Sequence, residues 1–517
     1  FAQHAFTFGV QDDWDVSENF QISAGIRYDF SQNPTAPPVN LNFIQRHGFS
    51  NTSTFDGKSV WQPRLGFNWN PTERLIIRGG VGIFAGGTPD VFVSNSFSNT
   101  GQLTNQIDIS RANPTGAGAL VPVCSLAANT ANRAAICNAA LNGVNGRTYD
   151  PLVTGFLTSN IASLAAAPVN AIDPNLSISR QMRASLSVNY DLGAFGSFGE
   201  GWLVGADLLY GEVIDAYQWT DIRSIPIGTL PDGRTRYGPK GAATTNQDLL
   251  MTNDQRGRSI IGVARISKEW DFGLGIDASY TRSDIKDVNA MTSATAGSLY
   301  SNNAFADPNF AAYGRSIYEI KNQLKFAVDY KRNFFGDNAT RFSLFGEYRS
   351  GRPYSLTMID RGTGRLPVFG TLGNGSRHLL YVPTGPNDPL VTYGAFTNTT
   401  TGVTQSAAEV QTLVDQYISA NGLEKYRGKI LPKNTQTAPS VFKVDIRVSQ
   451  DIPTFGFGKV KLFADLENAL NLIDSDWGSL RQVSFPQTAA LVTVECAATS
   501  GSNCTQYRYS RYENPNL

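Results

Sequence analysis

Alternation of apolar and polar residues with a period of two runs through most of this chain and constrains its fold more than any other feature. From Phe20 to Phe30 the even positions are apolar and the odd positions are polar or small. Successive side chains of a β-strand point to opposite faces, so such a segment has one apolar and one polar face. The pattern predicts twelve antiparallel strands, at residues 5–14, 20–30, 61–69, 75–84, 182–190, 202–210, 259–266, 274–283, 324–331, 342–349, 441–448 and 460–466.

Three of these strands carry the pattern more weakly, and it leaves their facing open: 5–14, 75–84 and 259–266. The connections between the strands alternate in length. Short ones cover residues 15–19, 70–74, 191–201, 269–273, 333–339 and 451–458. Long ones cover residues 31–59, 85–177, 214–258, 285–319, 350–439 and 467–517.

Loops this long are unusual in a compact soluble domain. They are typical of an outer-membrane barrel, which has short periplasmic turns and long extracellular loops. Aromatic residues also stand near the strand ends, where interfacial girdles form; they are Trp14, Phe30, Trp69, Tyr190, Trp202, Tyr210, Tyr280, Tyr330 and Tyr348. The sequence therefore predicts an all-β protein, a transmembrane antiparallel β-barrel with long extracellular loops. A soluble β-sandwich is the alternative, but it gives no reason for the alternating loop lengths.

The composition agrees with a membrane barrel. Charged residues make up only 17% of the chain and aromatic residues 11%, whereas about a quarter of an ordinary soluble domain is charged. The 43 Lys and Arg residues balance 43 Asp and Glu residues, which argues against a nucleic acid partner. No segment reaches the roughly 18 consecutive apolar residues that a membrane helix needs. The mean hydropathy of -0.22 is compatible with alternating strands, whose apolar faces are averaged out.

The four cysteines fall in two close pairs, Cys124 with Cys137 and Cys496 with Cys504. Neither pair has a CxxC spacing, and neither lies near one of the three histidines. We expect two local disulfides, formed in an oxidising compartment. Free thiols are the alternative, and a zinc site is disfavoured.

One long connection contains a helix signal. Ser406 to Glu409 matches a capping box, apolar residues at helical spacing follow as far as Ile418, and Asn421-Gly422 supplies a stop. We expect a helix that packs over the barrel mouth. A lid that contacts a ligand is the alternative.

Several ordered segments resemble TonB-dependent outer-membrane transporters, and together they are most similar to the Oar-type branch. That branch carries an N-terminal carboxypeptidase-regulatory-like domain. The resemblance spans nearly the whole chain and is carried by Val10 to Trp14, Asn19 to Asp29, Gly346 to Tyr354, Val444 to Pro453, Leu462 to Leu472 and Asp474 to Gly478.

This resemblance implies active transport across the bacterial outer membrane. In the family, loops capture a substrate outside, and energy from the inner membrane moves a plug and opens a path through the lumen. Transporters of this family have a plug domain, an energy-coupling box and a 22-stranded barrel. We expect residues 1–517 to be a single domain, the C-terminal part of such a barrel with about 12 of its strands, lacking the plug and the N-terminal strands.

The implied partners are outer-membrane lipid and a TonB-type energy-coupling complex, the latter acting through the missing N-terminal part. A surface lipoprotein or another outer-membrane protein is a further candidate partner. The chain already begins strand-like, without a secretion signal, so we expect that a preceding segment has been removed. We also expect the strands at 5–14 and 460–466 to pair with other strands of the same transporter rather than with each other.

No catalytic constellation is evident, because the histidines have neither a nucleophile elbow nor a metal-ligand spacing near them. We predict no enzyme activity, no cofactor and no metal site. The acidic pairs Asp474/Asp476 and Asp284/Asp287 lack the spacing of a calcium cage. Gly79 to Gly82 lies within a strand, which favours close packing or barrel bending over phosphate binding.

Charged residues on the polar faces of the strands form a set that we expect to face the lumen. Both signs are present, so we expect most of them to pair with one another or with a plug, and substrate handling by a few is the alternative. This lumen set comprises Arg27, Asp29, Arg64, Arg78, Arg183, Asp207, Asp277, Lys325, Asp329, Lys331, Glu347, Arg349, Lys443, Asp445, Arg447, Lys461 and Asp465.

Two other functions stay open from the sequence. One is a passive pore, in which the twelve strands form a complete barrel. The other is a surface protein whose loops bind partner proteins while the barrel only anchors it. The substrate class is not readable, since aromatic-rich loops suit glycans, peptides and siderophores equally.

Overall fold

The computed structural model of the chain describes residues 2–86, 90–102, 107–112, 121–126, 131–143, 145–158, 166–194, 199–241, 245–310, 312–362, 364–400, 402–454 and 458–515. Parts of two connections predicted to be short, residues 195–198 and 455–457, lie outside the described residues. Within the described ranges, no helix is both long enough and apolar enough to cross a membrane.

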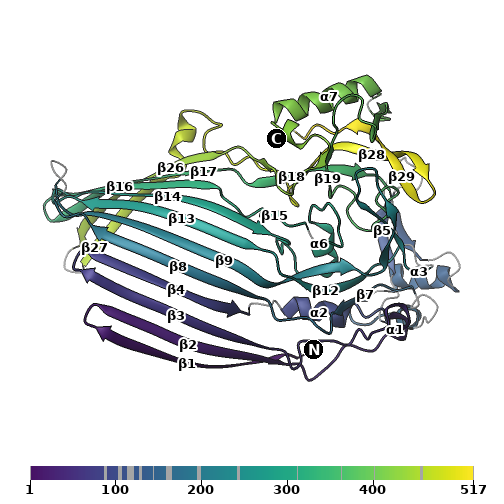
Figure 1. The fold of residues 1–517 in the computed structure, drawn as a ribbon, viewed down its shortest axis with the longest axis horizontal. Helices are drawn as coiled ribbons and strands as arrows, with labels where there is room; N and C mark the ends of the chain where they lie inside the picture. The colour runs from purple at the N-terminus through teal and green to yellow at the C-terminus, as the bar shows by residue number, and fades with distance from the viewer. Residues whose placement is uncertain are drawn as a thin grey trace.

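Twelve long strands form one antiparallel sheet in which each strand pairs with the next along the chain (Figure 1). All twelve predicted strands are confirmed, and so is the predicted fold class. In order across the sheet they are β1 (His4–Ser17), β2 (Phe20–Gln32), β3 (Ser59–Thr72), β4 (Leu75–Ala85), β8 (Arg180–Asp191), β9 (Trp202–Asp221), β13 (Arg258–Glu269), β14 (Leu274–Asp287), β16 (Asn322–Phe335), β17 (Asn338–Arg349), β26 (Val441–Thr454) and β27 (Gly458–Leu466).

Glycines in this sheet allow strands and aromatic rings to approach closely. A Cβ atom on Gly79 would lie 2.4 Å from the ring of Phe67 on the neighbouring strand β3. A Cβ atom on Gly346 of β17 would lie 2.2 Å from the ring of Phe326 on β16. At Gly79 the structure thus shows close packing, one of the two roles that the sequence favoured for the glycine run in β4.

The long connections gather at one end of the strands and fold together into a body, which we call the outer cap (right side of Figure 1). The sequence showed these segments as loops with a single helix, and that description was incomplete. Most of the missed strands are short, and several are buried along their whole length. In β18 (Pro353–Asp360), for example, seven of eight residues are buried. Such a strand has no polar face, so it shows no alternation.

One cap sheet has the order β19-β18-β28-β29-β21, with β25 added on β18. Its strands β18 and β28 are parallel, as are β21 and β29. The bounds are β19 (His378–Leu379), β21 (Val391–Tyr393), β25 (Gln436–Thr437), β28 (Thr488–Ser500) and β29 (Asn503–Tyr512).

The other cap strands form smaller ladders or extend the large sheet. β9 runs past its predicted end at residue 210, because its last part pairs with β12 in the cap. These strands are β5 (Asp108–Ala112), β6 (Val121–Ser125), β7 (Val169–Ile172), β10 (Ser224–Thr229), β11 (Thr235–Pro239), β12 (Asp248–Asp254), β15 (Gly314–Arg315), β20 (Tyr381–Val382), β22 (Phe396–Thr397), β23 (Thr404–Gln405) and β24 (Lys429–Ile430).

Short helices complete the cap and its neighbourhood: α1 (Leu41–His47), α2 (Asp90–Ser98), α3 (Arg133–Asn142), α4 (Pro151–Thr158), α6 (Ala296–Ser301), α7 (Ala407–Ala420), η2 (Glu424–Tyr426) and η3 (Ala469–Leu472). The predicted helix is α7, and both hydrogen bonds of its capping box are present between Ser406 and Glu409. Asn421 is its C-cap residue, and Gly422 follows with a φ of 64°. This helix prediction is confirmed.

The hydrophobic cores of the described chain lie in the cap. One core joins β18, β20, α7, β28 and β29, and a second joins α2, β7, β9, β12 and α6. Both predicted disulfides are confirmed. Cys124–Cys137 links β6 to α3, and Cys496–Cys504 links β28 to β29. The cap is therefore a packed body rather than a set of independent loops.

Candidate functional site

The register of the large sheet decides which side chains share a face, because residues paired across two strands point to the same side. Ser343 of β17 pairs with Asp329 on one side and with Arg447 on the other, and Arg447 pairs in turn with Asp465. Following such pairs from strand to strand places every residue of the lumen set on one face, which we call the polar face.

Ion pairs connect several of these residues. Arg27 Nε lies 2.6 Å from Asp29 Oδ1, Lys443 Nζ lies 3.0 Å from Asp445 Oδ2, and Arg447 Nε lies 2.5 Å from Asp465 Oδ1. Asp207 pairs with Arg265 at 3.0 Å. Arg265 was missed because the weak pattern of its strand left its facing open.

Neutral polar groups serve other members of the set. Gln323 donates to Glu347, Ser343 donates to Asp329, and Arg78 donates to Asn68. The polar face thus combines charges of both signs with hydrogen-bonding partners. The polar face is therefore a hydrophilic surface with charges of both signs. Such a surface suits a water-filled or plugged lumen better than a contact with lipid.

The opposite face of the sheet exposes large apolar side chains. Phe8 is 64% exposed, Trp61 is 58% exposed and Leu462 is 57% exposed. A contiguous apolar surface of this kind is unfavourable in water and is expected where the solvent is lipid. Some aromatic residues depart from the pattern, among them Phe84, Phe345 and Phe463, which stand on the polar face by register.

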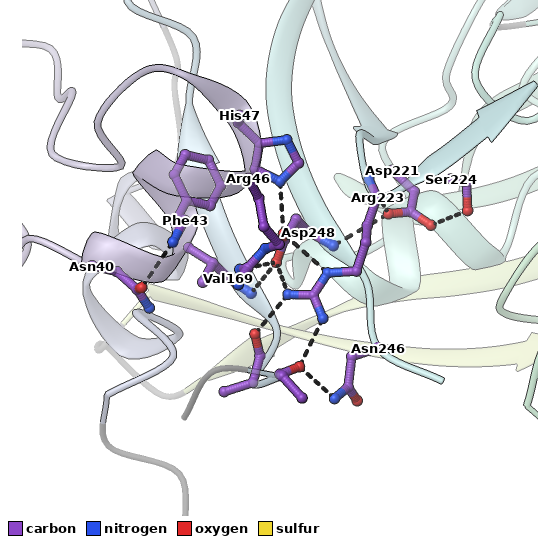
Figure 2. Close-up of polar contacts among 12 residues, drawn as sticks. Asn40, Phe43, Arg46, His47, Val169, Asp221, Arg223, Ser224, Asn246 and Asp248 are labelled. Carbon is purple, nitrogen blue, oxygen red and sulfur yellow. Dashed lines mark hydrogen bonds and ion pairs between the residues drawn. The ribbon is translucent and has the colours of Figure 1, made fainter. Parts of the chain in front are cut away.

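In the cap, two buried residues, Arg223 and Asp248, and two partly buried ones, Arg46 and His47, form a polar network that we call the Asp248 cluster (Figure 2). The distances to the Asp248 carboxylate oxygens are 2.9 Å from Arg46 Nε, 2.8 Å from His47 Nε2 and 2.6 Å from Arg223 Nη2. Val169 also donates its backbone N–H to Asp248, at 3.0 Å.

Local sequence explains how these side chains meet. Asn40 caps α1 by accepting from the backbone N–H of Phe43, and the last turn of α1 carries Arg46 and His47. Asp248 opens β12, which lies between β7 and β9. The cluster therefore joins three of the long connections. Sequence reasoning missed it, because no local pattern marks a contact between positions 201 residues apart.

The electrostatics of the cluster indicate a structural role. Burial alone would raise the pKa of Asp248, but the hydrogen bonds from His47 and Arg223 lower it below its ordinary value. Asp248 therefore stays ionised and fully partnered. Such a network fastens the cap and leaves no group free for proton transfer or metal binding.

A second buried group surrounds His378. Its ring stacks on Phe369 at 3.6 Å between centroids, and neither ring nitrogen has a hydrogen-bond partner among the described residues. Burial and the charges of Arg377 and Arg234 lower the pKa of His378 well below its ordinary value. The imidazole is thus neutral and acts as an aromatic packing residue.

Three of the four carboxylates in the acidic pairs Asp474/Asp476 and Asp284/Asp287 form ion pairs with cations. Asp284 pairs with Arg258 at 3.3 Å, Asp287 with Lys433 at 2.5 Å and Asp476 with Arg481 at 3.2 Å. Throughout the described part of the chain, no group of three or more His, Cys, Asp or Glu residues is arranged to hold a metal ion.

A groove of about 460 Å³ lies in the cap. Amide side chains dominate its polar lining, with Asn99, Asn170, Asn246 and Gln247. The amide nitrogen of Gln247 is buried and has no hydrogen-bond partner among the described residues. Amides both donate and accept hydrogen bonds without carrying charge, so this amide groove suits a neutral polar ligand.

An amphipathic sheet of twelve meandering strands under a packed outer cap defines a β-barrel protein of the membrane-spanning class. Residues 1–475 match the family described as "Outer membrane beta barrel domain", so the chain belongs to that family. It is accordingly a protein of the bacterial outer membrane. No curated protein sequence matches the chain.

Solved structures with similarity to the chain include the FrpB iron transporter from Neisseria meningitidis, with 10% identity and a TM-score of 0.38 over 91% of this chain and 41% of that one. The siderophore receptor PirA from Acinetobacter baumannii shows 10% identity and a TM-score of 0.39 over 92% of this chain and 43% of that one. A mutant of the ferric enterobactin receptor PfeA from Pseudomonas aeruginosa shows 8% identity and a TM-score of 0.39 over 90% and 40%. The chain spans about two fifths of each of these proteins.

Proposed function

We propose that this chain forms barrel strands and the outer cap of a TonB-dependent transporter that captures a substrate outside the cell and imports it through a plugged lumen. The observation that carries the proposal is the build of the cap. Six long connections are packed into one body with its own hydrophobic cores and two disulfides. A rigid body of this kind suits recognition of a particular ligand better than flexible loops around an open barrel entrance do, because fewer groups have to be ordered on binding.

In this proposal the polar face lines the lumen and the apolar face contacts lipid. The ion pairs of the polar face would then hold the lumen side of the barrel together and contact a plug. The single-domain organisation of residues 1–517, the 22-stranded frame, the plug and the TonB-type complex all come from the sequence resemblance. The pairing of β1 and β27 with other strands of the same transporter belongs to the same set of predictions.

The amide groove is the candidate site for substrate capture. Its uncharged donors and acceptors favour neutral polar ligands such as oligosaccharides over anionic chelates. Candidate substrates should therefore be tested in the order neutral glycans, peptides and ferric siderophores.

Uptake by cells that produce the full-length protein tests the proposal. Labelled ligands from these three classes are offered with and without a protonophore, and surface binding is measured separately. We expect saturable uptake of one class that stops when the protonophore is added, while surface binding persists. Uptake that is linear in concentration and insensitive to the protonophore would support the passive pore. Binding without any uptake would support the surface protein.

A further inference from the structure

A charged groove of about 900 Å³ lies where the large sheet meets the cap. Its floor includes Leu208 of β9 and Ile260 of β13, and β14 supplies Arg282 and Lys286. Residues of β15 and of the segment 432–435 close it on the cap side. We call it the rim groove.

The rim groove opens on the apolar face of the sheet. Along β14, Tyr280, Arg282, Asp284 and Lys286 occupy alternate positions and therefore share one face. Tyr280 is 43% exposed and pairs across the sheet with Leu324, another exposed apolar residue. The face thus changes from apolar to charged directly after Tyr280, as it does where a barrel leaves the hydrocarbon core and enters the headgroup layer.

Positive charge exceeds negative charge in the groove. Asp284 forms an ion pair with Arg258 of β13, the cross-strand neighbour of Lys286. Glu319 forms an ion pair with Arg315 at 2.5 Å. Three further cations have no carboxylate within ion-pair distance among the described residues: Arg282, Lys286 and Lys321. Nearby carboxylates are therefore already engaged, whereas these cations are available to an external anion.

Arg315 adds an independent sign of a missing anionic partner. Its Nε donates to Glu319 and its Nη1 donates to Thr437, but its Nη2 is buried and has no hydrogen-bond partner among the described residues. A buried guanidinium donor without a partner is costly, and a phosphate oxygen satisfies such a donor well.

We propose that the rim groove binds a phosphate of an outer-leaflet glycolipid. The phosphate oxygens would accept hydrogen bonds from Arg315, Lys286 and Lys321, while the acyl chains would run down the apolar face past Leu208 and Ile260. A soluble anion would use only the cationic part of the groove, whereas a phosphorylated lipid uses both parts. This inference goes beyond transport and rests on the assignment of the apolar face to lipid.

Binding by the full-length protein in detergent micelles tests this inference. The probes are fluorescent lipid A with both phosphates, the same glycolipid after phosphatase treatment, and inorganic phosphate as a competitor. We expect Lys286→Gln with Lys321→Gln to weaken binding of phosphorylated lipid A about tenfold or more, since two charge-assisted hydrogen bonds are lost. The dephosphorylated lipid should bind weakly to every variant.

A matched control removes two cations from the cap surface outside the groove, Arg147→Gln with Lys240→Gln, and should leave lipid A affinity unchanged. Equal losses in both double variants, or equal binding of the dephosphorylated lipid, would overturn the proposal. Displacement by inorganic phosphate at a similar concentration would show a site for soluble anions instead. Heat-modifiability on gels monitors folding, and the single variant Lys321→Gln at an exposed position provides a milder test. None of these readouts depends on transport.

Discussion

At the scale of single residues, neighbouring positions of β17 occupy opposite environments. Leu344 pairs with Val328 and Ile446 on the apolar face, whereas Ser343 pairs with Asp329 and Arg447 on the polar face. We predict that Leu344→Arg destabilises the barrel by about 2 to 4 kcal/mol, because it places a charge in hydrocarbon. Ser343→Arg should be tolerated much better, since Asp329 can pair with the new cation.

Assembly and heat-modifiability of the two variants in outer membranes would measure this difference. The two substitutions introduce the same side chain at adjacent positions, so each serves as the control of the other. The opposite ranking would show that the assignment of the faces is inverted, and it would remove the basis of the rim groove proposal as well.

Asp360 in the cap should make local stability depend on pH. Burial raises its pKa to about 6, although its Oδ2 accepts hydrogen bonds from the backbone N–H groups of Val368 and Phe369, both at 2.9 Å. Because the folded pKa exceeds the unfolded one, the folded state binds more protons between about pH 4 and pH 6. This contribution to stability is complete below about pH 4 and is lost as the pH rises through 6.

Asp360→Asn keeps the acceptor oxygen and removes the titration. We therefore expect the variant to resist local opening better than the wild type above pH 6, by up to roughly 3 kcal/mol, and to match it near pH 4. Hydrogen exchange of the amides of Val368 and Phe369, corrected for the intrinsic rate at each pH, would measure the difference. A difference that is independent of pH would contradict the prediction.

At the scale of secondary structure, α7 shows how a local signal sets an element. Its Ser406 hydroxyl accepts from the Glu409 backbone, and the Glu409 carboxylate accepts from the backbone N–H of Ser406. These hydrogen bonds lower the pKa of Glu409. We predict that Ser406→Ala destabilises the first turn of α7 by about 1 kcal/mol.

Hydrogen exchange of residues 407–411 should accelerate in this variant, while the barrel strands exchange as before. Thr412→Ala in the middle of α7 is a matched control, because it removes an exposed hydroxyl from the same helix and leaves the capping box of Ser406 and Glu409 intact. Equal acceleration in both variants would show that the capping box does not determine the stability of the N-terminus of α7.

At the scale of the whole molecule, the Asp248 cluster ties the cap together. Removing the charge of Asp248 leaves Arg223 buried without a counter-ion, which typically costs about 3 to 5 kcal/mol. We expect Asp248→Asn to loosen the contacts among α1, β7 and β12 while the large sheet stays intact. Limited proteolysis should then cut the cap segments faster than in the wild type.

Asp271→Asn, in the short turn between β13 and β14, supplies the control and should leave the rate of cap proteolysis unchanged. Loss of heat-modifiability in Asp248→Asn would contradict the prediction, because it would mean that the cap and the sheet fold as one cooperative unit. An unchanged rate of cap proteolysis in Asp248→Asn would show that the cluster does not hold the cap.

Features of this protein that depend on neighbours along the chain could be predicted from the amino-acid sequence. Period-two alternation is set within each strand, so it revealed the twelve strands and the residues that share their polar faces. The capping box of α7 and the closely spaced cysteine pairs are equally local. Each of these features could be recognised without knowing which distant segments would pack against it.

The construction of the cap and the residues that form its sites could not be predicted in this way, because they depend on contacts between distant segments. β18 is buried along nearly its whole length and so lacks alternation. His47 meets Asp248 across 201 positions of sequence. The rim groove, too, exists only because β13, β14, β15 and the segment 432–435 meet at one edge. Such sites depend on packing between segments that are distant in sequence, and a local pattern does not predict which of these segments will pack together.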